Sequence, residues 1–347
     1  MQYRFIAKKQ NDCYHNLIMK NRVLLIVFMF FSVSIFAKAI KEKHTAPESM
    51  RFAVLNGPSG MCFARMFDQV MQVNGVPVEY EVCASPDVLI PKLLKNEIDF
   101  GILSPNLAAK IYNSSENSIV VGAVTGFGML KIISKDDEVR TFADLKGKTV
   151  YVAGAGSTPE YVFRYLLSKN GINTDEKDSN AVVLNFSIPA AELPVAIISD
   201  KIEYAVVPEP FATVAVQKSS GKVKKCINLT HVWSELNELS NDYPMTTIVI
   251  NKNFAKKHPE LTKQFLEECR KSIEWTLSNP EETGILVEKY TLGLKKEIVS
   301  KAVPNCAFAF LSAHDAKNAV EQLLHIFYTY APESIGNKIP SKNFYLK

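Results

Sequence analysis

Short apolar runs alternate with stretches of helical periodicity in the first part of the chain. Strands are predicted at 50–55, 78–82 and 99–103, where apolar residues are bounded by turn residues. Between them, apolar residues recur three and four positions apart, which predicts helices. One should have Phe63, Phe67, Val70 and Met71 on its buried face, and the next should have Leu89, Leu93 and Leu94. Ser85-Pro86 and Ser104-Pro105 mark two helix starts. The strand–helix–strand–helix–strand order favours a parallel sheet with crossover helices.

A second series with the same order begins near residue 149. Strands are predicted at 149–153, 182–186 and 204–207, with helical periodicity between them. Ser157 and Glu160 are expected to form a capping box at the start of the first of these helices. Ile98–Leu103 matches Ile202–Val207 residue by residue in type, and each segment runs into a proline-containing helix start. Two similar lobes are the favoured interpretation, and a chance recurrence of ordinary strand–helix order is the alternative.

Beyond residue 240 the pattern no longer repeats. A strand at 245–250 and long helices from Pro259 and after Ser312 have no counterpart in the second series. They are expected to complete the first lobe, so that the chain crosses between lobes more than once. The predicted fold class is α/β, with two similar lobes, each a mostly parallel sheet flanked by helices, joined by a hinge with a ligand cleft between them. The expected division is 1–39 as a signal peptide, 50–135 plus 241–330 as lobe 1, 136–240 as lobe 2 and 331–347 as a C-terminal extension.

The N-terminus has the organisation of an export signal. Val23–Ala37 is an uncharged apolar run, preceded by Lys20 and Arg22 and followed by the triplet Ala37-Lys38-Ala39. A membrane-spanning helix needs about 20 apolar residues, which makes the transmembrane interpretation the weaker one. We therefore expect a cleaved signal peptide and an exported mature chain starting near Ile40, with Met1 and Met19 both open as the start.

Removal of this segment changes the charge of the protein. The chain of 347 residues has 40 Lys and Arg against 36 Asp and Glu, a net charge of +4. Six of those basic residues and one acid lie in residues 1–39, which leaves 34 against 35, a net of −1. No positive excess remains that would favour nucleic acid or a membrane surface. A hydrophobic content of 47% with 15 Gly and 17 Pro excludes a disordered or collagenous chain.

Signatures of catalysis and cofactor binding are incomplete or absent. Gly147-Lys148-Thr149 resembles the end of a phosphate loop, but Phe142 stands where the first glycine belongs. Gly154-Ala155-Gly156 begins a dinucleotide fingerprint whose third glycine position is Pro159. The histidines have no metal-ligand spacing, and the cysteines are read as buried thiols, with one or two disulfides as the alternative. We predict no enzyme activity, no cofactor and no metal.

Polar turns follow the predicted strands at the edge where open α/β sheets bind ligands. They comprise Asn56–Gly60, Ser104–Asn106, Gly154–Thr158 and Pro208–Pro210, two from each lobe. Helix N-termini at these turns would suit an anionic group, and simple helix capping by the serines is the alternative.

Two further residues are ambiguous. Glu209 would repel an anion, or would face a ligand amine or ring N–H. Tyr243 is expected to pack in the lobe junction, with stacking on a ligand as the alternative, and the same two interpretations apply to Pro244 and Met245 beside it. The candidate ligand-binding residues are Asn56, Gly57, Pro58, Ser59, Gly60, Ser104, Pro105, Asn106, Ser157, Thr158, Glu209 and Tyr243.

Several segments resemble one known family. They are similar to type II periplasmic solute-binding proteins of ABC transporters, in the branch that binds nitrate, sulfonates, taurine and thiamine precursors. The resemblance covers about residue 50 to the C-terminus. The matching segments are Thr141–Val150, Gly156–Tyr161, Val207–Ala212, Phe254–Glu282, Pro332–Gly336 and Asn343–Tyr345.

The resemblance implies capture of a small solute between the lobes, hinge closure, and delivery to a membrane permease driven by a cytoplasmic ATPase. It assigns the pocket to Asn56–Gly60, Ser104–Asn106, Ser157–Thr158 and Glu209. The chain lacks a lipobox, which points to a free periplasmic protein, and a monomer is expected. It also lacks the cysteine-rich motif of the pyrimidine-forming enzymes in the wider family. Two alternatives stay open: an enzyme of thiamine-pyrimidine-precursor metabolism on the same fold, and an exported sensor or adhesin module.

Overall fold

The computed structural model describes residues 46–116, 118–175, 177–237 and 242–347. The predicted signal peptide, 1–39, lies outside the described residues. Residues 47–347 form one unit by their contacts. No helix in the described ranges combines the length and apolar character needed to cross a bilayer.

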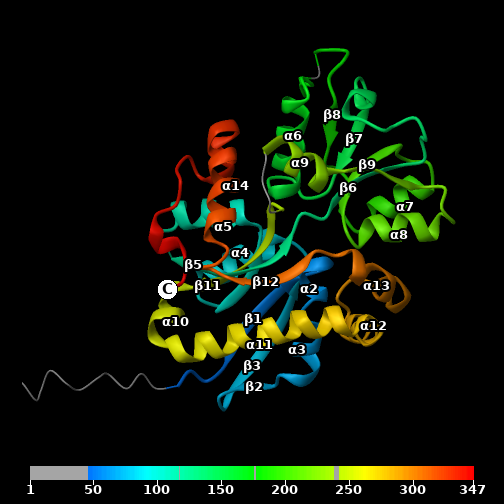
Figure 1. The fold of residues 1–347 in the computed structure, drawn as a ribbon. Coiled ribbons are helices and arrows are strands. Elements are labelled where there is room, and N and C mark those ends of the chain that lie inside the picture. The colour runs from blue at the N-terminus through cyan, green and yellow to red at the C-terminus, as the bar shows by residue number, and fades with distance from the viewer. Residues whose placement is uncertain (1–45, 117, 176, 238–241) are drawn as a thin grey trace, which may run out of the picture. The chain divides into compact units, whose positions relative to one another are not determined.

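The first part of the fold is a seven-stranded sheet in the order β12-β5-β11-β4-β1-β3-β2 (Figure 1). β1 pairs in parallel with β3 and β4, as the alternating pattern predicts. The strands are β1 (Met50–Leu55), β2 (Gln72–Val73), β3 (Val76–Cys83), β4 (Phe100–Leu103), β5 (Ile119–Phe127), β11 (Pro244–Asn251) and β12 (Phe308–Ser312). The helices are α2 (Pro58–Met61), α3 (Ala64–Gln69), α4 (Pro86–Leu94), α5 (Pro105–Ser114), α10 (Lys252–Lys257), α11 (Pro259–Ser278), α12 (Pro280–Lys289), α13 (Lys296–Ala302) and α14 (Lys317–Tyr330).

The second part is a five-stranded sheet in the order β10-β6-β9-β7-β8. Its parallel strands β8-β7-β9 repeat the arrangement of β3-β1-β4, which confirms the prediction of two similar α/β lobes. The strands are β6 (Leu130–Ser134), β7 (Thr149–Val152), β8 (Val183–Asn185), β9 (Tyr204–Pro208) and β10 (Lys224–Asn228). The helices are α6 (Thr158–Lys169), α7 (Leu193–Ile198), α8 (Phe211–Lys218), α9 (Leu229–Asn237) and the 3-10 turn η2 (Phe142–Leu145).

The chain passes between the sheets twice, after β5 and again after α9. The strand that follows each crossing pairs antiparallel with one of the parallel strands of the sheet that it joins. β6 pairs with β9 in this way, and β11 pairs with β4. The reason is geometric, because a chain arriving from the other lobe enters at the carboxyl edge of the parallel strands. The parallel prediction therefore holds for three strands of each lobe, β3-β1-β4 and β8-β7-β9. β6 belongs to the second sheet.

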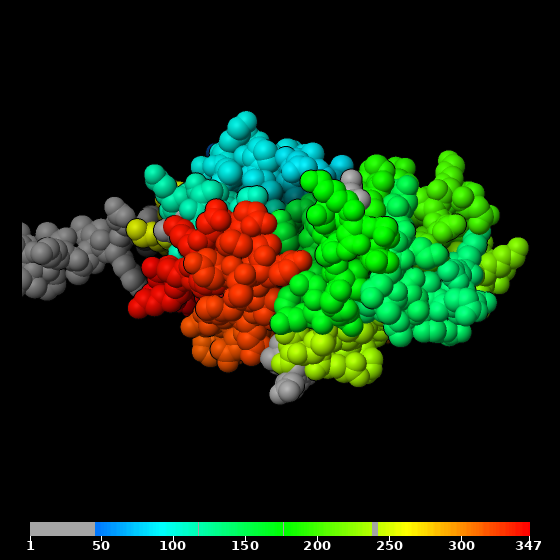
Figure 2. All heavy atoms as spheres, turned by 90° about the horizontal axis from the view of Figure 1, so that it is seen from above, coloured from blue at the N-terminus to red at the C-terminus, as the bar shows by residue number. Residues whose placement is uncertain are grey.

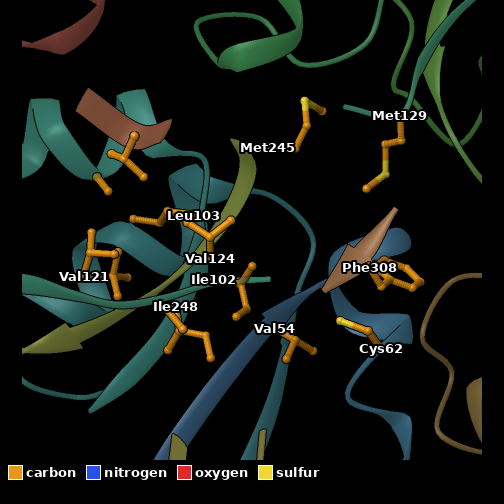
Figure 3. Packing of buried hydrophobic residues seen from close by; sticks show 14 of the residues in the cluster. Val54, Cys62, Ile102, Leu103, Val121, Val124, Met129, Met245, Ile248 and Phe308 are labelled. Carbon is orange, nitrogen blue, oxygen red and sulfur yellow. The ribbon is translucent and has the colours of Figure 1, made fainter. Parts of the chain in front are cut away.

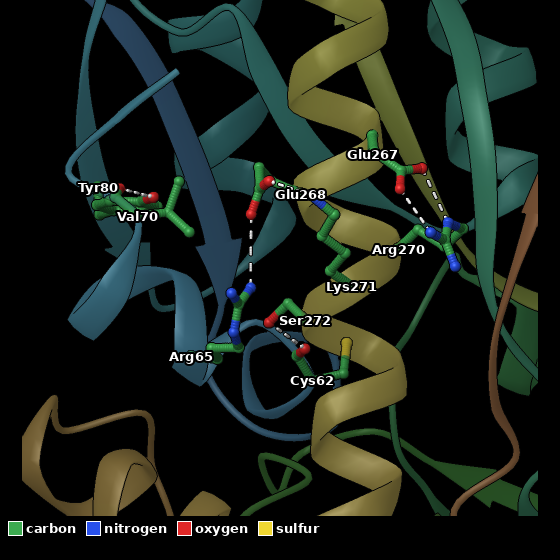
Figure 4. A network of polar contacts seen from close by, with 9 residues as sticks. All are labelled: Cys62, Arg65, Val70, Tyr80, Glu267, Glu268, Arg270, Lys271 and Ser272. Atoms are coloured by element: carbon green, nitrogen blue, oxygen red, sulfur yellow. Dashed lines mark hydrogen bonds and ion pairs between the residues drawn. The ribbon is translucent and has the colours of Figure 1, made fainter. Parts of the chain in front are cut away.

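The interior of the first lobe is filled by aromatic and aliphatic side chains (Figure 3). Between its sheet and α11, Phe52 packs edge-on against Phe63 and Phe265, with ring centroids 5.2 and 5.3 Å apart. The polar side of α11 carries ion pairs such as Arg270 with Glu267 (Figure 4). The amphipathic pattern predicted from Pro259 onward is therefore the pattern of a helix that covers one face of a sheet.

Some local predictions were wrong. The residues after Gly60 do not form one helix, because the chain breaks between α2 and α3 and turns at Val70 into β2. Met71, expected on the buried face, is consequently 65% exposed. Leu94 at the end of α4 is also exposed, since the helix stops there.

The C-terminal residues pack on the first lobe. Leu346 donates its backbone N–H to Val121 of β5 at 2.8 Å, and Tyr345 bridges to the same residue. The Asn113 side chain of α5 donates to the Ile335 carbonyl at 2.7 Å. These contacts hold the 3-10 turn η4 (Pro332–Ile335) against α5.

Candidate functional site

The predicted polar turns all lie at the carboxyl ends of the parallel strands. Asn56 follows β1, Ser104 follows β4, Gly154 follows β7 within two residues, and Glu209 follows β9. Two come from each lobe, and direct contacts join the lobes at these turns. The turns are therefore the starting point for a candidate ligand site.

The turn after β1 is shaped by close approach of the second lobe. Gly57 has a φ of 101°, and a Cβ added to it would lie 3.2 Å from the Phe211 ring at the start of α8. Its N–H donates to the Leu292 carbonyl at 3.1 Å. Ser59 is buried and directs its hydroxyl to the Leu55 carbonyl at 3.4 Å, whereas Asn56 is exposed and Pro58 half-buried. Asn56 is thus the accessible polar side chain of this turn.

The turn after β4 reaches across to the second lobe through Asn106. The Nδ2 group donates to the Gly156 carbonyl at 2.9 Å, and Oδ1 accepts from the Thr158 hydroxyl at 3.1 Å. The Ser104 hydroxyl also donates to Oδ1, at 2.8 Å. Asn106, Thr158 and Pro105 are buried, and Ser104 stays partly exposed.

The N-terminus of α6 already carries a carboxylate. Glu160 Oε2 accepts the Gly156 N–H at 2.7 Å, and its Oε1 accepts from Arg164 Nε, also at 2.7 Å. Ser157 does not cap the helix with its hydroxyl, which instead donates to the Gly154 carbonyl at 2.6 Å. The predicted pairing of Ser157 and Glu160 in a capping box is therefore wrong, since the carboxylate reaches back to Gly156 instead.

Glu209 is fully buried and is turned into its own lobe. Its Oε2 accepts the Thr213 N–H at 3.0 Å in the first turn of α8, and its Oε1 forms an ion pair with Lys225. Lys225 also donates to the Thr213 hydroxyl at 3.0 Å. The expectation that Glu209 faces a ligand amine does not match this orientation, because the ammonium group beside it is that of Lys225.

Glu209 and Lys225 influence neighbouring groups from both lobes. Burial, and next the Glu209 carboxylate, raise the pKa of the Cys306 thiol in the first lobe. Burial lowers the pKa of the Lys131 ammonium group, and Glu209 opposes this shift. Lys131 Nζ donates to Asn228 Oδ1 at 2.7 Å. The cations of this region thus have partners in the protein.

Tyr243 lies in the lobe junction, as its favoured prediction has it. The residue is buried, and its ring packs edge-on against Trp233 with centroids 5.1 Å apart. A Cβ on Gly128, at the first crossing, would lie 2.6 Å from the Thr230 hydroxyl and 3.1 Å from the Tyr243 ring. Burial raises the pKa of the Tyr243 phenol. Close packing of backbone against these side chains explains why a glycine stands at the crossing.

Sequence reasoning named Met245 beside Tyr243 but missed two other apolar residues near the crossings, Met129 and Phe308. Met129, Met245 and Phe308 are buried at the strand ends that lead toward the second lobe (Figure 3). A hollow of about 320 Å³ lies between α7 and α8 of one lobe and the segment 288–298 of the other. The type of the buried residues Met129 and Phe308 does not distinguish them from other core residues. Only their position near a crossing could have identified them in the sequence.

The described surface also has a charged hollow away from these turns. A hollow of about 760 Å³ lies between α3, β2 and α11, and charged side chains of both signs line it. Figure 4 shows part of that network, in which Arg65 and Lys271 flank Glu268. In the described part of the chain, no group of three or more His, Cys, Asp or Glu could hold a metal ion.

Comparison with known proteins identifies one matching family. The family model described as NMT1/THI5 like matches residues 66–283. YtlA of Bacillus subtilis (strain 168), whose name suggests a binding protein, is 23% identical over 205 residues. That match spans 58% of this chain and 58% of the relative.

Solved structures share the fold over most of the chain. An ABC transporter protein from Parabacteroides distasonis is 25% identical with a TM-score of 0.71, and the match covers 87% of this chain and 99% of that one. The aliphatic sulphonate binding protein SsuA of Escherichia coli is 15% identical with a TM-score of 0.67, over 87% and 93% of the two chains. The nitrate-binding protein NrtA of Synechocystis PCC 6803 is 16% identical with a TM-score of 0.60, over 84% and 85%. At identities of 15 and 16%, the last two comparisons support the fold alone.

Proposed function

Because the chain belongs to the NMT1/THI5-like family, we propose that it is a solute-binding receptor without enzyme activity. It captures a small organic solute between its lobes and delivers it to the permease of an ABC importer. The structural relatives are named as binding proteins or ABC transporter components, which supports this role.

One observation carries the proposal. Polar turns from both lobes meet at the carboxyl ends of their parallel strands, with Asn106 and Thr158 joined across the lobe boundary at 3.1 Å. Ligands of open α/β sheets bind at this edge. A solute held there would contact both lobes at once, which is the arrangement that couples binding to closure.

The candidate residues divide by accessibility into two groups. Asn56, Ser104 and Ser157 are exposed or partly exposed and are the side chains that we propose contact the solute. We propose that Met129 and Met245, which are buried at the two crossings, supply its apolar contacts. We propose that the remaining candidates, which are buried or half-buried, hold these side chains in place without contacting the solute: Gly57, Pro58, Ser59, Gly60, Pro105, Asn106, Thr158, Glu209 and Tyr243.

The electrostatics of the site favour a solute without a full negative charge. The N-termini of α6 and α8 already hold the carboxylates of Glu160 and Glu209. These groups occupy the positive end of each helix dipole and would repel a second anion. We therefore propose recognition through hydrogen bonds and apolar contact.

The division into lobes follows the sheets. We propose that lobe 1 comprises 46–127 with 244–347 and that lobe 2 comprises 130–237. Residues 1–39 would be a cleaved signal peptide and the mature protein a periplasmic monomer, as the sequence of this segment suggests.

Thermal-shift screening of the purified mature chain, residues 40–347, tests the proposal. Sulfonates, pyrimidines, flavins and amino acids would be compared, each at about 1 mM. A solute present at a hundred times its Kd stabilises the folded state by about 2.7 kcal/mol, which raises Tm by several degrees. The proposal is abandoned if no solute raises Tm and the protein turns over one of them.

N-terminal sequencing of the native protein discriminates the enzyme alternative. The receptor is expected to begin near Ile40. An uncleaved Met1 or Met19 would instead favour an intracellular enzyme on the same fold.

A further inference from the structure

The Asn106 side chain makes hydrogen bonds with both lobes at once. Its Oδ1 accepts from the hydroxyls of Ser104 at 2.8 Å and Thr158 at 3.1 Å. Its Nδ2 donates to the carbonyls of Gly156 at 2.9 Å and Ser334 at 3.3 Å. Ser104 and Ser334 belong to the first sheet's lobe, and Gly156 and Thr158 to the other.

These four bonds use the whole hydrogen-bonding capacity of the amide. An asparagine amide has two N–H donors and a carbonyl with two lone pairs. Asn106 is fully buried, and so is Thr158. A side chain saturated in this way has no polar group left for a solute while the lobes are in contact.

The two bonds within lobe 1 fix the amide before it meets the second lobe. Ser104 determines the orientation of Oδ1, and the Ser334 carbonyl of η4 determines that of Nδ2. A side chain that is already fixed loses little conformational entropy when the lobes come together. Its two hydrogen bonds to lobe 2 therefore stabilise the lobe contact with little entropic cost to offset them.

Contacts of α14 with α6 continue the junction outward from Asn106. Tyr161 of α6 packs against Phe327 of α14 with ring centroids 5.6 Å apart. The Tyr330 hydroxyl donates to the Arg164 carbonyl at 3.2 Å. Figure 2 shows the C-terminal helix, in orange-red, side by side with the green surface of the second lobe.

We propose that Asn106 is a positioning residue that latches the two lobes together and does not itself bind the solute. This goes beyond the proposed function, because the latch joins the lobes whatever the solute is. Removal of the cross-lobe bonds shifts the balance toward separated lobes.

A double-mutant cycle with Asn106→Ala and Thr158→Val, measured by urea unfolding of the mature chain, tests the contact. Loss of one shared hydrogen bond corresponds to a coupling of about 2- to 13-fold in the unfolding equilibrium constant. Thr158→Ser keeps the hydroxyl and is expected to behave as wild type. If Asn106→Ala does not fold, the difference in unfolding free energy between Thr158→Val and Thr158→Ser still measures the loss of the hydroxyl.

Small-angle X-ray scattering on the same proteins tests the latch. Asn106→Ala and Thr158→Val are expected to increase the radius of gyration. Thr125→Val is the matched control, since its buried hydroxyl lies 3.0 Å from that of Thr246 within one lobe. It should lower stability and leave the radius of gyration unchanged. Additive effects in the cycle would overturn the contact, and coupling without any change in scattering would overturn the latch.

Discussion

Two lysines that are neighbours in the sequence have different electrostatic surroundings. Lys225 pairs with Glu209, whose carboxylate is fully buried, whereas Lys224 pairs with Asp137 and both side chains are more than half exposed. Loss of a partner is costly when it leaves a charge in a low-dielectric interior and nearly neutral when water replaces it. The same chemical change at the two positions therefore separates burial from charge.

We predict that Lys225→Met lowers the free energy of unfolding by about 2–4 kcal/mol, because Glu209 loses its counter-charge. Lys224→Met, the matched control, is expected to lower it by less than about 1 kcal/mol. Urea unfolding followed by circular dichroism measures both. Equal losses would show that Glu209 does not depend on Lys225.

Gly57 is the residue whose backbone the lobe contact constrains. With φ of 101° and Phe211 3.2 Å from the position of a Cβ, Gly57→Ala meets both backbone strain and a clash. Gly75 has a φ of 80° and open space around it. Gly75→Ala therefore lowers the free energy of unfolding through backbone strain alone, without a steric clash.

We predict that Gly57→Ala is the more destabilising of the two by at least about 1 kcal/mol, measured as the difference in unfolding free energy. A smaller effect at Gly57 than at Gly75 would mean that Phe211 does not pack there in solution.

At the scale of elements, the connection between β6 and β7 depends on one carboxylate. Asp144 Oδ2, in η2, accepts the N–H groups of Arg140 at 3.0 Å and Thr141 at 2.8 Å, and the Thr141 hydroxyl at 2.9 Å. These bonds favour the ionised form and lower the pKa of the Asp144 carboxyl, the bond to Arg140 most of all.

A depressed carboxyl pKa stabilises the fold above the unfolded-state value, near 4, and that contribution is lost as the pH falls through the folded-state value. We predict that Asp144→Asn loses stability at pH 7 and that the difference from wild type narrows as the pH is lowered toward 3. Unfolding titrations at several pH values measure it. A difference that stays constant with pH would contradict the assignment.

The parallel core of each lobe could be predicted because its signals are local. Apolar runs such as 50–55, turns such as Ser104-Pro105 and the repeat near residue 204 all act within a few residues. The direction of strand β11 could not be predicted, because it depends on where the chain returns from the other lobe. The amide of Asn106 and the carboxylate of Glu209 lie at predicted turns, but their orientations depend on Ser334 and Lys225, which are 228 and 16 residues away.

At the scale of the whole molecule, net charge does not favour an anionic solute, and neither do the helix dipoles of α6 and α8. The predicted mature chain has 34 basic against 35 acidic side chains, so it has no overall field that attracts anions. Glu160 and Glu209 occupy the N-termini of α6 and α8, and the nearby cations Arg164 and Lys225 are paired with them. Selectivity must then come from polar and apolar groups at the strand ends.

We predict that, of two solutes of similar shape, the mature protein prefers the uncharged one. Benzenesulfonate and benzenesulfonamide differ mainly in charge, and the sulfonamide is expected to give the larger rise in Tm at equal concentration. Glu160→Gln is expected to narrow the gap, because it removes a negative charge from the N-terminus of α6 and leaves Arg164 unpaired. The control is Glu235→Gln, an exposed glutamate paired with His231 on α9. A larger rise with benzenesulfonate in the wild-type protein would mean that the helix N-termini accept an anion despite their glutamates.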